Sequence, residues 1–391
     1  MENKQGLKVL ITGAILQFFL GIIYVWSVFV KPVSDHFEWA VDKVKLTSSF
    51  MLCCFVLGIL IGGKLQVKVG TQKIVLTGGL LMAVGMLATS FIPASVAWLI
   101  YITYGIIGGF GVGMAYNAII SCAQKWFPKK RGLATGISVC MFGFSTVVFA
   151  PLIEVLVGSV GLLNTLRILA AIFFVFVIAL FSFIKLPEET GAAAAAAVTD
   201  ARQYTTSEML KTKQFYLIAL SMMFCTASYF ILNPSFKTLA GERGLSDAIA
   251  TLLVMITGIA NTAGRLVVPL VSDKIGREYA TFGILIITAI ATGILCVAGG
   301  TGLIVMIALI AFCYGGSSGI YPLVTGKYFG VKNIGSNYGA VMIGFACSAL
   351  LFPIIMNQIT STSAKFIVLA IVAAVGSGLI LILNATSKAK K

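Results

Sequence analysis

The sequence predicts an all-α membrane protein whose twelve transmembrane helices form two pseudo-symmetric six-helix bundles. Of its 391 residues, 59% are hydrophobic and only 10% are charged, and the mean hydropathy is +1.02. Water-soluble domains are not built from this composition. Apolar runs of about 20 residues, the length that crosses a bilayer, recur along the whole chain. The chain is therefore expected to lie in the lipid bilayer.

The expected spans are separated by charged residues, by Pro93 and Pro128, and by glycine-rich turns such as Gly299-Gly300. The first run is too long, and too weakly preceded by basic charge, for a cleaved signal peptide. The twelve spans are expected near residues 7–30, 46–66, 74–92, 97–120, 133–157, 163–185, 214–238, 248–272, 279–299, 301–325, 336–358 and 362–384.

Basic residues are distributed unequally between the two ends of the spans. With both termini placed in the cytoplasm, 20 lysines and arginines lie on the cytoplasmic side and 6 lie outside. The positive-inside rule therefore predicts cytoplasmic N and C termini, with a bacterial inner (plasma) membrane as the location. The net charge of +15 then reflects topology and contact with anionic lipid, with no sign of nucleic-acid binding.

One long polar segment, residues 186–213, divides the chain into halves. Its middle contains six consecutive alanines, 192–197, which is typical of a linker, and a short helix is expected there on the cytoplasmic face. The predicted domains are residues 1–185, an N-terminal six-helix bundle, and residues 214–391, a C-terminal six-helix bundle, with 186–213 as a cytoplasmic linker.

The two halves resemble each other in sequence. Residues 63–70 correspond to residues 269–276 at a shift of 206, and Lys125-Trp126-Phe127 recurs as Lys327-Tyr328-Phe329 at a shift of 202. Two parallel six-helix repeats around a central cavity are the plan of many secondary transporters, whose substrate site lies near the middle of the membrane.

Arg265 is the one charged residue in residues 248–272. A guanidinium at membrane depth costs several kcal/mol unless an anion or a wet cavity receives it. An arginine can also tether helices through backbone carbonyls. The planar guanidinium matches a carboxylate through two parallel hydrogen bonds, which lysine cannot reproduce, so Arg265 is the leading candidate for binding an organic anion.

The string Asp273-Lys274-Ile275-Gly276-Arg277 resembles the cytoplasmic loop signature of the major facilitator superfamily. An aspartate at a helix end can pair with a basic residue and hold one conformation closed. The candidate gating residues are Asp273, Lys274, Arg277 and Arg131. In the first copy of the repeat Val67 stands where the acid belongs, so a latch there is weakened.

Further strings resemble the oxalate/formate antiporter family, relatives of the monocarboxylate transporters. They are Gly21-Ile22-Ile23-Tyr24-Val25-Trp26-Ser27 with Pro32, residues 125–136 (KWFPKKRGLATG), residues 208–212 (EMLKT) and Ser336-Asn337-Tyr338-Gly339. This resemblance implies that Arg265 binds the substrate carboxylate. The oxalate transporter has a second cation, a lysine in span 11, and the matching position in this sequence is Phe345.

A single buried arginine neutralises one carboxylate, whereas a dianion would leave one charge uncompensated. The expected substrate is therefore a small monocarboxylate such as lactate, pyruvate or formate. An oxalate:formate antiporter is the alternative. A sensor or a channel for anions on a transporter scaffold is a rival of a different class.

Other candidate substrate contacts come from the resemblance or from helical spacing. The resemblance implies Tyr116, Tyr24, Phe142 in place of a cavity tyrosine, and Tyr314 in place of a tryptophan. Asn117 ends span 4 beside Tyr116, and Gln17 is a polar residue in span 1 for which packing is an equal alternative. Spacing adds Tyr321, two turns after Tyr314, and Asn261, one turn before Arg265. Helix packing or an interfacial aromatic belt explains each tyrosine equally well.

The coupling mode is open between anion exchange and proton symport. In animal monocarboxylate transporters an aspartate at the position of Asn261 takes part in proton coupling, and asparagine cannot titrate. Glu154 and Arg167 are expected to form an ion pair. No enzyme activity, cofactor or metal is expected, and the implied partners are a small carboxylate, protons in the symport case, and the lipid bilayer, with a monomer as the usual form.

Overall fold

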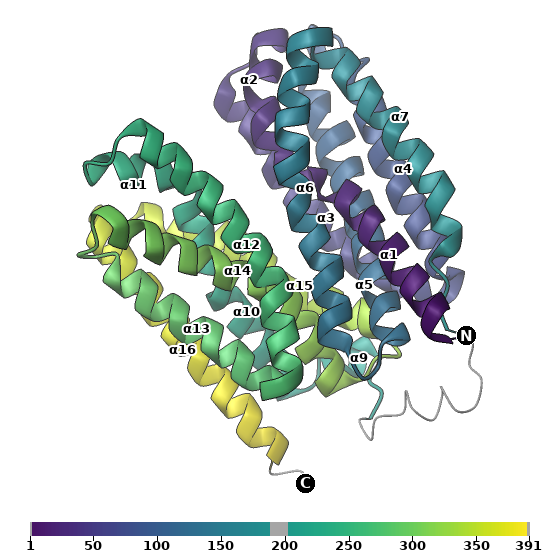
Figure 1. The fold of residues 1–391 in the computed structure, drawn as a ribbon, viewed down its shortest axis with the longest axis vertical. Coiled ribbons are helices and arrows are strands. Elements are labelled where there is room, and N and C mark those ends of the chain that lie inside the picture. Colours follow the sequence, from purple (N-terminus) through teal and green to yellow (C-terminus); the bar gives the residue numbers. More distant parts are fainter. Residues whose placement is uncertain (1, 188–201, 389–391) are drawn as a thin grey trace. The chain divides into compact units, whose positions relative to one another are not determined.

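The computed structural model describes residues 2–187 and 202–388, and every regular element in these ranges is a helix (Figure 1). Twelve of the described helical segments are long and apolar enough to cross a membrane, which confirms the predicted number of spans. The alanine run 192–197 of the predicted linker lies outside the described residues, whereas residues 202–213 include the short helix α9 (Thr206–Met209).

The elements of the first half follow one another with short connections. They are α1 (Glu2–Leu20), η1 (Gly21–Val25), α2 (Trp26–Phe37), α3 (Val41–Val69), α4 (Thr71–Thr89), η2 (Ala94–Leu99), η3 (Tyr101–Gly108), α5 (Gly109–Trp126), α6 (Arg131–Val160), α7 (Leu162–Leu180) and η4 (Phe181–Phe183).

The second half repeats this sequence of long helices. Its elements are α9 (Thr206–Met209), α10 (Lys213–Leu232), η5 (Asn233–Ser235), α11 (Phe236–Glu242), α12 (Asp247–Ile275), α13 (Arg277–Ile294), α14 (Gly300–Phe329), α15 (Ile334–Asn357) and α16 (Thr362–Lys388).

Several helices are longer than the apolar runs that predicted them. The first span was expected over residues 7–30, but helical structure continues to Phe37 and stops where Glu38 takes a left-handed conformation with φ 49°. The fourth was expected to end at residue 120 and continues to Trp126, just before Pro128. A helix ends where its backbone hydrogen bonding stops, at a turn residue. This residue need not coincide with the end of the apolar run.

The described residues form two compact units. The N-unit comprises residues 2–129, 141–187 and 331–340, and the C-unit comprises residues 130–140, 202–330 and 341–388. Each unit therefore includes a short segment from a helix whose remainder belongs to the other unit. The predicted boundaries 1–185, 186–213 and 214–391 remain predictions.

Reciprocal glycine contacts recur in both repeats. In the N-unit Gly58 of α3 faces the Phe110 carbonyl of α5, and Gly113 of α5 faces the Phe55 carbonyl of α3. In the C-unit Gly264 of α12 and Gly315 of α14 make the corresponding contacts with Phe312 and Asn261. A Cβ atom at any of these glycines would collide with backbone, so only glycine allows each pair of helices to pack this closely.

The turns that follow α3 and α12 are also equivalent. Gly70 has φ 90° and Gly276 has φ 96°, a conformation that side-chain-bearing residues rarely adopt. Each glycine ends one long helix and begins the next. The shift of 206 residues found in the sequence is therefore a repeat in three dimensions.

Span 1 is not one continuous α-helix, because the five-residue 3₁₀ segment η1 separates α1 from α2. A 3₁₀ segment inside a helix changes the direction of the side chains that follow it and often marks a functional position. Here it carries Tyr24. The break therefore lies beside one of the predicted substrate contacts.

Candidate functional site

Arg265 lies in the middle of α12 and is 1% exposed. Its Nε donates a hydrogen bond of 3.0 Å to Oδ1 of Asn261, one turn earlier on the same helix. The bond uses one of the five guanidinium N–H donors and fixes the plane of the group. Asn261 orients the guanidinium but, as a neutral amide, supplies no charge to neutralise it.

Close packing of α12 on α14 determines where this pair lies. A Cβ at Gly315 would meet the backbone carbonyl of Asn261, and a Cβ at Gly319 would lie 3.0 Å from the carbonyl oxygen of Arg265. The glycines of α14 therefore bring its backbone directly against the turn of α12 that carries the arginine.

An aromatic cluster in the C-unit contains two of the predicted residues. Tyr314 of α14 stacks on Tyr229 of α10 with ring centroids 3.9 Å apart and planes 11° apart. Phe230 packs edge-on against both Tyr314, at 5.7 Å, and Phe345, at 5.0 Å. The sequence did not indicate Tyr229 or Phe230, because aromatic residues inside an apolar span look like ordinary packing.

The N-unit has its own aromatic cluster, which includes three predicted residues. Phe142 of α6 lies edge-on to Tyr24 at 5.4 Å and to Tyr116 at 4.7 Å. Phe55 of α3, which the sequence did not single out, completes the group at 5.3 Å from Tyr116. Phe142 and Phe345 are 203 residues apart, so equivalent positions on α6 and α15 carry the phenylalanines of both clusters.

Gln17 lies fully buried beside the N-unit cluster. Its Nε2 donates to the backbone oxygen of Tyr116 at 3.0 Å, while its Oε1 is buried and has no hydrogen-bond partner among the described residues. Ser145, one turn after Phe142, packs against Gly21, one turn after Gln17. The hydroxyl of Ser145 is also buried without a partner in the described chain. Buried polar atoms of this kind usually serve a water, an ion or a ligand.

Two predicted contacts are engaged in hydrogen bonds between helices. Asn117 Nδ2 donates to the backbone oxygens of Ile59, at 3.0 Å, and Gly335, at 2.6 Å, within the N-unit. Tyr321 is fully buried, and its hydroxyl lies 3.1 Å from Oγ of Ser221 on α10. A substrate would have to break these bonds to use the amide hydrogens or the phenol proton, so the structure favours a packing role for both residues.

Asp273 makes a contact different from the one that was predicted. Its carboxylate accepts hydrogen bonds from the backbone N–H groups of Gly132, at 3.1 Å, and Leu133, at 3.3 Å, in the first turn of α6. A side-chain pair with a basic residue was expected. The carboxylate instead satisfies helix N–H groups that have no partner within the helix and complements the positive end of the helix dipole.

The basic gating candidates differ in their surroundings. Arg131 and Arg277 lie within electrostatic range of Asp273. Arg277 also donates to the carbonyl of Leu323 at 3.1 Å. Lys274 is exposed. Asp273, Arg131 and Arg277 therefore form one charged group in the C-unit.

An ion pair between a buried carboxylate and a partly exposed lysine was missed by the sequence reasoning. Glu278 of α13, with a side chain 5% exposed, pairs with Lys327 at 2.6 Å and accepts a hydrogen bond from the Tyr328 hydroxyl at 2.9 Å. The repeat contained a signal, because Lys327-Tyr328 matches Lys125-Trp126. In both units this aromatic residue also approaches a backbone oxygen further along the chain: Trp126 donates to Lys185 just after η4, and the Tyr328 hydroxyl lies 3.3 Å from the oxygen of Leu383 in α16.

The predicted ion pair between Glu154 and Arg167 is wrong. Arg167 instead donates to the side chain and backbone of Ser90 and to Asn164, and its guanidinium lies over the ring of Phe91. Polar groups at the end of α4 are closer to Arg167 than a carboxylate on α6.

Together these observations define a class of protein. A bundle with twelve candidate spans, two equivalent repeats and a buried oriented arginine is typical of a secondary transporter. No group of three metal-ligating side chains that could hold an ion is found in the described part of the chain. The family model of the Major Facilitator Superfamily matches residues 10–353 and 218–391. The chain belongs to this superfamily of integral membrane transporters and is not an enzyme.

Curated relatives support the resemblance seen in the sequence. The chain is 25% identical over 345 residues to the uncharacterized transporter YhjX of Escherichia coli (strain K12), covering 87% of this chain and 85% of the relative. It is 28% identical over 325 residues to the oxalate:formate antiporter of Oxalobacter formigenes, covering 82% and 76%. Monocarboxylate transporter 13 of Rattus norvegicus is 24% identical over 372 residues, covering 93% and 85%.

Solved structures share the fold. The proton:xylose symporter XylE superposes with a TM-score of 0.75 at 14% identity, covering 97% of this chain and 96% of its own. The transporter FucP, solved in the outward conformation, superposes with a TM-score of 0.72 at 15% identity, covering 96% and 97%. At these identities the comparison establishes the major facilitator fold alone.

Proposed function

We propose that this protein is a secondary transporter of small monocarboxylates, such as lactate, pyruvate or formate, in a bacterial inner membrane with both termini in the cytoplasm. The observation that carries the proposal is Arg265, buried in α12 and oriented by Asn261. Its guanidinium receives the substrate carboxylate through two parallel hydrogen bonds. The relatives named for oxalate, formate and monocarboxylates support this substrate class.

The aromatic cluster of the C-unit favours a monoanion with a short carbon skeleton. Phe345 is 4% exposed and packs against Phe230, so its position offers an apolar ring and no second cation. A dianion such as oxalate would bring a charge that one arginine does not balance. An oxalate:formate antiporter therefore requires another cation.

The buried charge also favours exchange as the coupling mode. An empty arginine is costly to enclose, whereas an arginine paired with a carboxylate is not. A carrier of this kind changes conformation readily only when loaded, which couples the movement of one anion to the return of another. Asn261 supplies no titratable proton, which argues against symport through that position. Asp273, which binds the start of α6, is proposed to stabilise one conformation of the cycle.

Counterflow in proteoliposomes tests the proposal. Vesicles preloaded with unlabelled lactate, pyruvate, formate or oxalate receive the matching labelled acid outside, with and without a pH gradient. Acceleration by a monocarboxylate, with oxalate inert, is expected. Arg265→Lys is expected to lose transport by about tenfold to a hundredfold while remaining folded, because the charge stays and the two-pronged geometry is lost.

Three results would contradict parts of the proposal. Preference for oxalate would favour the alternative antiporter, and uptake driven only by the pH gradient would establish symport. Unchanged kinetics in Arg265→Lys would remove the site assignment. Binding without counterflow would indicate a sensor, and flux that neither saturates nor responds to preloading would indicate a channel.

A further inference from the structure

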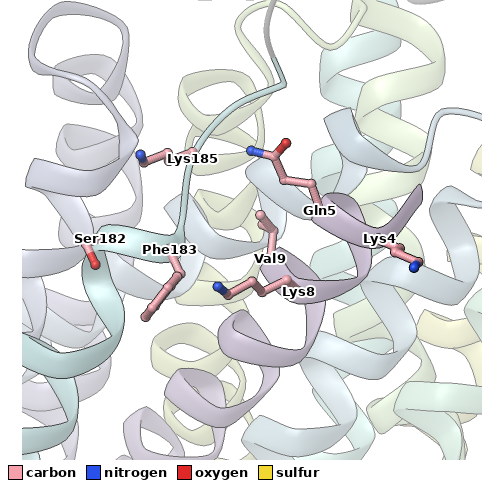
Figure 2. A pocket seen from close by; sticks show the side chains of 7 residues that line it. All are labelled: Lys4, Gln5, Lys8, Val9, Ser182, Phe183 and Lys185. Carbon is pink, nitrogen blue, oxygen red and sulfur yellow. The ribbon is translucent and has the colours of Figure 1, made fainter. Parts of the chain in front are cut away.

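A cavity of about 520 Å³ lies in the N-unit, far from Arg265 in sequence (Figure 2). Figure 2 shows side chains from α1 and from the segment around η4 surrounding it. Among the described residues that line it, three are lysines and none is a carboxylate. The lining residues are Lys4, Gln5, Lys8, Val9, Ser182, Phe183 and Lys185.

The Trp126 side chain contacts both walls of this cavity. Trp126 Nε1 donates to the backbone oxygen of Lys185 at 2.6 Å. On the other wall, a Cβ at Gly6 of α1 would lie 3.1 Å from the Trp126 ring, so α1 packs directly on the indole. Lys185 and the first turns of α1 are therefore held in place by ordinary packing, and the cavity is a preformed feature of the N-unit.

The lysines are positioned to receive an anion. Lys8 lies over the ring of Phe183 at 4.3 Å, and its ammonium group, like those of Lys4 and Lys185, has no ion pair with a carboxylate among the described residues. All three lysines are exposed. A concave surface with three positive charges attracts a compact polyanionic group such as a phosphate.

Apolar side chains beside the cavity distinguish a lipid from a soluble anion. Leu7 and Ile11 on α1 are 51% and 52% exposed. Ile11 lies one turn further into the span than Lys8 and on the same side of the helix, since residues three, four and seven apart share a face. The acyl chains of a lipid whose headgroup lies at the lysines would therefore pack along these exposed aliphatic side chains.

We infer that this cavity binds the phosphate headgroup of an anionic membrane lipid. Basic pockets between helices at the membrane surface are suited to this chemistry. The lysines contact the phosphate, Gln5 and Ser182 contact the polar headgroup, and the acyl chains follow α1. The inference is independent of the transported substrate, because it involves a different part of the protein.

Native mass spectrometry of the purified protein tests this site. Wild-type protein is titrated with dioleoylphosphatidylglycerol, with zwitterionic dioleoylphosphatidylcholine, and with inorganic phosphate. The wild type is expected to bind phosphatidylglycerol at least tenfold more tightly than phosphatidylcholine, since each lysine near a membrane surface contributes about fivefold. The triple variant Lys4→Gln, Lys8→Gln, Lys185→Gln is expected to lose this preference.

Two further triple variants separate the site from net charge. Lys68→Gln, Lys211→Gln, Lys213→Gln removes the same charge from exposed lysines elsewhere, and Lys4→Arg, Lys8→Arg, Lys185→Arg keeps the charge in place. Both are expected to retain the lipid preference. If the glutamine triple does not yield a monodisperse protein, the single variant Lys8→Gln is expected to weaken binding about fivefold.

Two results would show that the cavity is not the lipid site. One is equal lipid binding by the wild type and the glutamine triple variant of the cavity. The other is an equal loss of lipid binding in the glutamine triple variant at the exposed lysines elsewhere. Lysine-dependent binding of inorganic phosphate without preference for phosphatidylglycerol would overturn the lipid assignment in favour of a soluble anion. Native mass spectrometry counts bound lipid without measuring transport. The test of the lipid site therefore holds even if the proposed transport function is wrong.

Discussion

Asn261 Oδ1 lies 3.0 Å from Arg265 Nε, one helical turn away on α12. The neutral amide orients the guanidinium and, unlike a carboxylate, brings no negative charge to it. A carboxylate at position 261 would neutralise the charge of Arg265 and would therefore compete with an anionic substrate. This relationship leads directly to the first prediction.

Asn261→Asp is expected to reduce monocarboxylate transport at neutral pH by at least about tenfold, because a fixed carboxylate competes with the substrate for Arg265. Activity should recover as the pH falls, since protonation of the new side chain removes the competing negative charge. Asn261→Leu is the control and should show weakened transport without that recovery. Uptake by Asn261→Asp that matches the wild type at every pH would contradict the model of the site.

Phe345→Lys is expected to shift preference from monocarboxylates toward dicarboxylates. A second cation beside the aromatic cluster would balance the second charge of oxalate. Equilibrium binding of labelled oxalate and labelled lactate measures the shift, and Phe345→Met controls for loss of the ring. If oxalate binding does not rise in the lysine variant, Phe345 does not determine the choice of substrate.

Asp273→Asn is expected to speed hydrogen exchange at the amides of Gly132 and Leu133 by about fivefold. These amides donate to the Asp273 carboxylate, and an anion at a helix N-terminus stabilises the first turn by about 1 kcal/mol. Mass spectrometry of peptides from the start of α6 measures the change. Asp35→Asn, at a position remote in sequence, should leave this segment unaltered. Exchange that is unchanged in Asp273→Asn would show that the carboxylate does not hold the helix start.

Glu208 gives α9 a pH-dependent N-terminal cap. Its carboxylate accepts hydrogen bonds from the backbone and hydroxyl of Thr205 and from Arg202, which lower the pKa of Glu208 below its ordinary value of 4.5. The capping contribution is therefore fully present above that ordinary value and is lost as the pH falls through the lowered pKa.

Exchange of the Thr205 and Glu208 amides should accordingly be slow near neutral pH and should accelerate, relative to an uncapped reference peptide, in acid. In Glu208→Gln the exchange rate of these amides, relative to that of the reference peptide, should be nearly independent of pH. A pH profile identical in the two proteins would show that the carboxylate does not cap the helix.

The resemblance between the halves was visible in the sequence because a backbone conformation that only glycine adopts easily places glycine at the same position in each repeat. Gly70 and Gly276 keep their shift of 206 residues because both need a positive φ between consecutive long helices. The contacts of Asp273 could not be obtained in this way. Whether a carboxylate meets a side-chain cation or backbone N–H groups depends on which helix begins beside it.

Hydropathy along the chain was enough to predict twelve spans, because burial of apolar surface is a property of each residue and its neighbours in sequence. The cost of a charge in lipid singles out Arg265 in the same way, and its role in binding an anion stays a prediction. The tertiary structure alone decided which predicted residues act together. It places Tyr314 against Tyr229 and directs the amide of Asn117 to Gly335, 218 residues away. Such partners depend on how distant helices pack, and a hydroxyl or amide in an apolar span has the same local pattern whether it binds a substrate or another helix.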